Sequence, residues 1–200
     1  MKSILHKTGL IALLLFAAQA HAATRTWNGN GTDNNWTTSA NWDVLPIAGD
    51  DLVFPTVGTR LSPNNNFAAL TSFASITVSG SGYTIGGNSV TLTGSLQGTL
   101  TSGSSAVGLV VAGGAVPGVK MNGVGGTLVL SGTNTFTGGV TIQAGTLSGN
   151  TSTNVFGTAG NITIGHTSGS DNATLLVGTS MTITRPVVLA TGTTGTLSSR

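Results

Sequence analysis

The segment from Gly125 to Leu147 constrains the fold more than any other part of this chain. Its text, GGTLVLSGTNTFTGGVTIQAGTL, consists of short runs in which apolar and polar residues alternate, separated by glycines. Alternation places the apolar residues of each run on one side of an extended strand. Strands this short cannot bury an apolar side alone, but stacked copies of them can. The residues expected to point inward are Leu128, Leu130, Val140, Ile142 and Leu147.

The first 22 residues have the features of a secretory signal peptide. Two lysines form a basic start, residues 10–18 are apolar, and the sequence AHA at 20–22 is a small-x-small cleavage site. A membrane anchor is the alternative, but a spanning helix needs ~20 apolar residues, about twice the length of this run. We therefore expect cleavage between Ala22 and Ala23.

Removal of this leader leaves a chain with almost no charge. Five Asp and no Glu balance the remaining basic residues, which are Arg25, Arg60, Lys120, Arg185 and Arg200. A nucleic-acid-binding protein needs clustered cations, and these five are scattered, so that class is excluded. The chain has no cysteine, so an exported form relies on packing and strand pairing instead of disulfides. Low net charge and regular β-branched runs argue against a disordered linker.

Two regions follow the leader. Residues 23–66 hold all three tryptophans and four of the five Asp, and we interpret them as an aromatic-rich cap that covers the apolar end of a stacked structure. Within this cap, 52–54 is the expected first strand and 64–66 an expected loop. Residues 67–200 carry strand-sized runs, expected at 76–78, 83–85, 90–92, 109–111, 162–164, 175–177, 181–183 and 187–189.

The spacing of these runs alone leaves a β-solenoid and a β-sandwich open. Runs recur every ~6 to 12 residues, which either architecture produces. Gly-Asn and Gly-Gly pairs, which would suit the hairpins of a sandwich, are present. A decision between the two needs a further signal.

That signal is a resemblance over 125–147. This segment resembles the autotransporter-associated β-strand repeat (passenger-associated transport repeat), whose usual text reads GxLxLSGxNTYTGGTTIxxGTL, with Phe136 in place of the usual Tyr. The stretch WNGNGTDNNW…NWDVLPIAGDDLVF resembles the segment that opens such proteins, and SGYTIGGNSVTLTG the run before the repeat. The resemblance implies an all-β, right-handed parallel β-helix. At ~20 to 25 residues per coil, residues 23–200 are long enough for about seven coils.

The resemblance also implies a function. The chain is similar to the passenger region of an autotransporter, and such a region is exported to the surface of a Gram-negative bacterium through a C-terminal barrel. We expect that barrel to lie outside this chain, which has only six Phe and one Tyr for aromatic girdles. The expected role is a structural or adhesive module whose partners are glycans or proteins of a host or neighbouring cell. Its alternative is a secreted carbohydrate-active β-helix that binds or cleaves a polysaccharide.

Few residues point to catalysis or metal binding. His166 has Asp171 and several serines nearby in sequence, but hydroxyls are so abundant that a turn histidine is the expected interpretation over a catalytic triad. A lyase would need cations gathered in one place, and Arg60, Lys120 and Arg185 are far apart in sequence. We therefore expect no enzyme activity, no catalytic residues and no cofactor.

The cap and the repeat leave two questions open. Asp33, Asp43, Asp50 and Asp51 share a compact segment in which a Ca²⁺ site is conceivable, although no calcium-binding nonapeptide occurs and a polar, turn-rich cap is the expected interpretation. Asn134 is expected at a turn. There its amide either bonds to adjacent coils, as stacked asparagines do, or completes its own turn.

Overall fold

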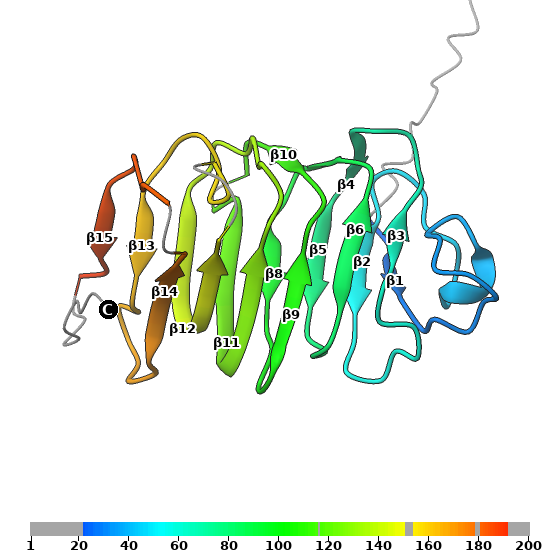
Figure 1. Cartoon of the computed structure of the whole chain (residues 1–200), viewed down its shortest axis with the longest axis horizontal. Helices are drawn as coiled ribbons and strands as arrows, with labels where there is room; N and C mark the ends of the chain where they lie inside the picture. The colour runs from blue at the N-terminus through cyan, green and yellow to red at the C-terminus, as the bar shows by residue number, and fades with distance from the viewer. Residues whose placement is uncertain (1–21, 116, 151–153, 179–180, 192–200) are drawn as a thin grey trace, which may run out of the picture.

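The computed structural model describes residues 22–115, 117–150, 154–178 and 181–191, so the apolar leader and Arg200 lie outside the described residues. The described chain is an all-β parallel solenoid of about 6 turns (Figure 1). All the pairs between its named strands are parallel, which confirms the solenoid over the sandwich. The right-handed sense implied by the resemblance stays a prediction.

The longest row of strands runs along the whole solenoid. Along this row the register advances by 20 residues from Ile76 to Leu96 and by 27 from Arg25 to Leu52, and the other steps of the row lie between these two values. In order along the row the strands are β1 (Thr24–Thr26), β2 (Asp51–Phe54), β5 (Ser75–Val78), β8 (Leu96–Gly98), β11 (Val119–Leu130), β12 (Val140–Gly149), β13 (Ile162–Ile164) and β15 (Val187–Leu189).

Two shorter rows complete the coils. The second row joins the first because β11 and β12 are long enough to belong to both. Its other members are β3 (Asn64–Asn65), β6 (Thr84–Gly87), β9 (Ser104–Val107) and β14 (Ala173–Val177). The third row is β4 (Thr71–Phe73), β7 (Val90–Leu92) and β10 (Val111–Gly113), and a short 3-10 helix η1 (Ser39–Asn41) lies in the N-terminal loops.

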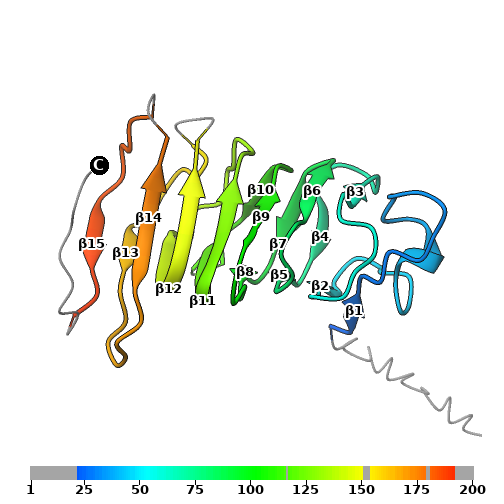
Figure 2. The same cartoon turned by 60° about the horizontal axis from the view of Figure 1, so that its bottom comes forward.

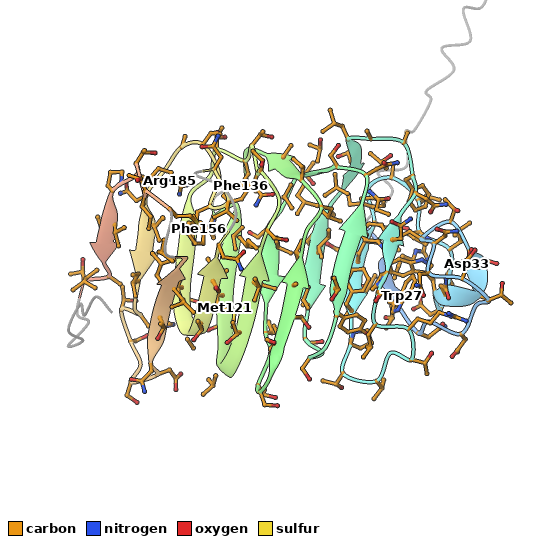
Figure 3. All side chains as sticks on the ribbon, viewed as in Figure 1. Trp27, Asp33, Met121, Phe136, Phe156 and Arg185 are labelled. Carbon is orange, nitrogen blue, oxygen red and sulfur yellow. The ribbon has the colours of Figure 1, made fainter. Side chains whose placement is uncertain are left out.

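Aligned side chains fill the interior. Strand pairing places one inward residue of each coil directly over the next. One such column is Leu52, Ile76, Leu96, Val119, Val140 and Ile162, all of them buried. A second inward column, two residues further along each strand, includes Gly98 and Met121. A Cβ added at Gly98 would lie 2.6 Å from the Sδ atom of Met121, so Met121, labelled in Figure 3, occupies the space that Gly98 leaves. All five residues expected to point inward are buried, which confirms the predicted facing.

An aromatic cluster closes the N-terminal end. Trp27, Trp36 and Trp42 are buried, as the cap interpretation predicts, and the loops that carry them cover the end of the stack (Figure 2). The rings of Trp27 and Trp42 meet edge to face with centroids 5.2 Å apart, and Phe54 of β2 packs 5.6 Å from Trp36. Edge-to-face pairs add to the free energy gained from area burial alone.

Three predicted elements differ from the structure. The strand expected at 109–111 begins only at Val111, as β10, and continues to Gly113. The expected loop at 64–66 contains strand β3, because Asn64 and Asn65 pair with the strand of the next coil. The expected strand at 181–183 is not assigned as a strand, although Met181 and Ile183 still pack against the core. At β3 the pairing with the neighbouring coil decides the backbone, which local sequence does not encode.

Candidate binding surface

A bend within β11 shapes the surface around the repeat. The pairing of β11 with β12 shifts between Met121 and Asn122 and again before Thr127, where the strand passes from the first row to the second. Such irregularities bend a strand and leave residues unpaired. The facing residue, Gly145, has a φ of 74°, and a Cβ there would lie 2.0 Å from the carbonyl oxygen of Gly123. Glycine is therefore required for the coils to approach at this corner.

A hollow of about 330 Å³ opens at this bend. The loop before β14 forms its far wall, held by a 2.7 Å hydrogen bond from the Gly145 N–H to the carbonyl oxygen of Asn172. We call it the polar hollow, and its lining consists of Val124, Gly125, Gly145, Thr146, Ser170, Asp171, Asn172 and Thr174. The side chains among these residues include hydroxyl, amide and carboxylate groups, beside the exposed side chain of Val124.

A row of hydroxyl groups leads into the polar hollow. Ser104, Thr127, Thr146 and Thr174 are successive register partners in four neighbouring coils, and none of them is buried. Strands in a sheet lie ~4.8 Å apart, so this hydroxyl row repeats at that interval along the solenoid. Alternation within each strand predicts the outward direction of Thr127. The alignment of the four residues depends on coil lengths that the sequence alone did not reveal.

His166 lies in the loop that leads to the polar hollow, but its geometry is that of a turn. Its Nδ1 atom accepts a 2.9 Å hydrogen bond from the backbone N–H of Ser168. In a Ser-His-Asp triad, Nδ1 instead carries the proton that it donates to the aspartate. His166 thus has the role expected of a turn residue. Asp171, the other candidate member of a triad, lines the polar hollow.

The four aspartates of the cap are held separately. Thr38 and Asn35 donate hydrogen bonds to Asp33, which lower the pKa of that carboxyl. Asp51 accepts a hydrogen bond from Ser75, and Asp43 from the backbone N–H of Thr26 at 2.9 Å. Asp50 pairs with Arg25. Among the described residues no three acidic or histidine side chains gather around a point where a metal ion would sit.

The three cations considered for a lyase are not brought together either. Arg60 Nε donates to the carbonyl oxygen of Gly31 at 2.7 Å, within the cap. Lys120 lies between the buried Val119 and Met121 of β11, on the outward side of the strand. At the opposite end of the solenoid, Arg185 donates to the carbonyl oxygens of Phe156 and Gly160, and burial lowers its pKa (Figure 3). Two of the three thus bind backbone carbonyls and contribute to structure.

Asn134 bridges three successive coils. Its side chain is buried; Oδ1 accepts from the Val111 N–H at 2.8 Å and Nδ2 donates to the Val155 carbonyl oxygen at 2.6 Å. Of the two interpretations left open by the sequence, the contact to adjacent coils is therefore the observed one. Its partners are backbone groups instead of stacked asparagines.

The described residues contain no helix that is both long and apolar enough to cross a membrane.

Comparison with known proteins agrees with the resemblance noted in the sequence. Residues 125–148 match the passenger-associated-transport-repeat family. Over an alignment of 196 residues, which covers 86% of this chain, it is 31% identical to "Adhesin BmaC autotransporter" of Brucella suis biovar 1 (strain 1330). The chain spans 5% of the length of that relative. No solved structure matches the chain.

Proposed function

We propose that this chain is an adhesive passenger module, exported and displayed on a cell surface or released from it. The observation that carries the proposal is the coincidence of two findings over the same residues. A passenger-associated transport repeat spans the end of β11 and most of β12 in a parallel solenoid, and most of the chain aligns with a protein described as an adhesin. A stiff stack of coils with little charge is suited to present surfaces and loops to a partner.

The contact surface in this proposal is the polar hollow together with the hydroxyl row. Hydroxyl, amide and carboxylate groups donate and accept hydrogen bonds without needing a charged partner. Such a surface fits glycans or polar protein loops on a host or neighbouring cell. The role is binding, without catalysis: Arg60 and Arg185, which a lyase would need free, hold backbone carbonyls, and no observation favours cleavage of a polysaccharide.

The proposal includes processing of the leader. Residues 1–22 direct export and are cleaved between Ala22 and Ala23, leaving a cap over 23–66 and the coils of 67–200. N-terminal sequencing of material collected outside the cytoplasm should begin at Ala23. Recovery of that material with Met1 still present would contradict the processing step.

Adhesion itself is tested with coated beads. Latex beads that carry residues 23–200 should resist detachment by flow from epithelial cell monolayers better than beads coated with albumin. A double variant of the polar hollow, Thr146→Val with Asp171→Asn, keeps side-chain size and should lower retention severalfold. A matched variant on another face, Thr77→Val, should not. Retention equal to that of albumin beads would refute adhesion to these cells, and prior treatment of the cells with glycosidase or protease separates glycan from protein partners.

A further inference from the structure

Ala23, the residue after the expected cleavage site, is docked on the solenoid. Its carbonyl oxygen accepts a hydrogen bond from the Asp51 N–H at 2.9 Å. Its own nitrogen donates to Oδ1 of Asp50 at 3.3 Å. Ala22 is exposed, and β1 begins at Thr24, directly after Ala23. The bond expected to be cut therefore joins an exposed residue to one whose nitrogen already faces a carboxylate.

Asp50 is a buried, ionised acceptor at this position. Only 4% of the residue is exposed, and its Oδ2 accepts hydrogen bonds from Arg25 Nε at 2.7 Å and from the Ile47 N–H at 3.0 Å. Burial raises the pKa of Asp50, but the hydrogen bonds from Arg25, Ile47 and Ala23 outweigh it and hold that pKa below its ordinary value.

The other charged groups on the surrounding elements are already engaged. Asp51, the next residue, accepts a hydrogen bond from Ser75 of β5. Asp43, in the loop before β2, accepts the N–H of Thr26. Arg25 is the one cation that these contacts bring to Asp50. Arg25 contacts the Oδ2 atom of Asp50. A second positive charge beside the Oδ1 atom would therefore reach the carboxylate on the side that Arg25 does not contact.

We propose that cleavage after Ala22 creates an α-ammonium group on Ala23 that forms a second ion pair with Asp50 and locks the N-terminal cap. The inference rests on the cleavage site in the proposed function. Hydrolysis of the Ala22–Ala23 bond adds one water, leaving a carboxylate on Ala22 and a protonated amine on Ala23. Before cleavage the same nitrogen is a neutral amide with one hydrogen. Afterwards the nitrogen is charged, so its hydrogen bond to the ionised Asp50 gains the attraction between opposite charges.

The sign of the pH dependence follows from this pairing. A free α-amino group has a pKa of about 7.7 to 8.0, and an ion pair in the folded state raises it. A group whose pKa is raised on folding contributes stability that is fully present below its unfolded value and lost as the pH rises through its folded value. If the pair raises the folded-to-unfolded ratio tenfold, the pKa of the amine is about one unit higher in the folded state, near 9.

Two purified chains test the proposal directly. One begins at Ala23 and the other at Ala22, so that they differ by one residue and both carry an amine. At pH 6.5 the chain that begins at Ala23 should show a folded-to-unfolded ratio about tenfold higher in urea titrations. The difference should fall below about twofold at pH 10.5 and in the Asp50→Asn background, whereas Asp43→Asn should preserve it. Equal stability of the two chains at pH 6.5 would overturn the proposal.

A second readout does not depend on the folding of a variant. After the leader, Lys120 is the only lysine, so reductive ¹³C-methylation gives NMR signals for one amino terminus and one side chain. The amino terminus of the chain that begins at Ala23 should titrate near pH 9. That of the chain that begins at Ala22 should titrate near 8. A value near 8 in both would overturn the ion pair even if the export site is correct.

Discussion

The facing of the repeat strands can be tested at two adjacent residues, Ile142 and Thr141. Ile142 is fully buried in the column between Met121 and Ile164, so Ile142→Asp removes a buried apolar side chain, a loss of about 1.5–3 kcal/mol. It also places a carboxylate without a partner in the interior, which costs at least a few kcal/mol more even if the group takes up a proton. The sum, about 4 kcal/mol or more, is a large share of the 5–15 kcal/mol typical of a domain.

Thr141→Asp introduces the same group one residue earlier with the opposite expectation. Thr141 points outward and pairs directly with Lys120 on one side and Thr163 on the other. A carboxylate across from Lys120 forms a cross-strand ion pair that contributes about 0.2–1 kcal/mol. The poor strand propensity of Asp offsets a similar amount. We expect a net change within about 0.5 kcal/mol.

Urea unfolding of the parent and both variants measures the difference. Only Ile142→Asp should shift the midpoint strongly, and the Thr141→Asp midpoint should become lower when added salt screens its pair with Lys120. Equal losses in the two variants would refute the assigned facing. A large loss in Thr141→Asp alone would mean that the register is displaced by one residue.

Three further predictions concern single contacts. Asn134→Ala leaves the Val111 N–H and the Val155 carbonyl buried without their partner, so the free energy of unfolding should drop by about 2–5 kcal/mol, against little change in exposed Thr135→Ala. Arg185→Met removes donors to backbone carbonyls near the last coils, and limited proteolysis should cut there faster than in the parent. Burial raises the pKa of Tyr83 to about 12, so the unfolded state, with an ordinary value near 10, loses its phenolic proton first. The melting temperature should therefore fall between about pH 10 and 12, and Tyr83→Phe should reduce that fall.

Local alternation was sufficient to predict the interior of the repeat. Leu128 and Leu130 are two residues apart, as are Val140 and Ile142, and a period of two places each pair on one face whatever the rest of the chain does. The aromatic cap was equally visible, because the three tryptophans stand among polar residues over 27–43 and need an apolar surface to pack against. Both predictions depend on residues close in sequence, and both are confirmed by burial.

Features that depend on coil length were not predictable in the same way. Asn64 and Asn65 have poor strand propensity, yet they pair because the neighbouring coil presents Gly86 and Gly87 in register. The polar hollow arises from the bend in β11 opposite a loop that lies about 50 residues further along the chain. The bend leaves no clear sequence signal, apart from the clustered glycines at 123, 125 and 126.

The stacking of coils is the central claim, and it predicts distances that grow with coil number. The chain has no cysteine, so single pairs of cysteines can carry spin labels. The outward residues Val53, Thr163 and Val188 belong to one column, with Thr163 five strands and Val188 six strands from Val53. At ~4.8 Å per strand, the Cα separation should be about 24 Å for Val53 and Thr163 and about 29 Å for Val53 and Val188. Double electron–electron resonance between spin labels measures both separations. Two separations that increase by one strand spacing would support the solenoid, whereas a Val188 label nearer to Val53 than the Thr163 label would contradict it.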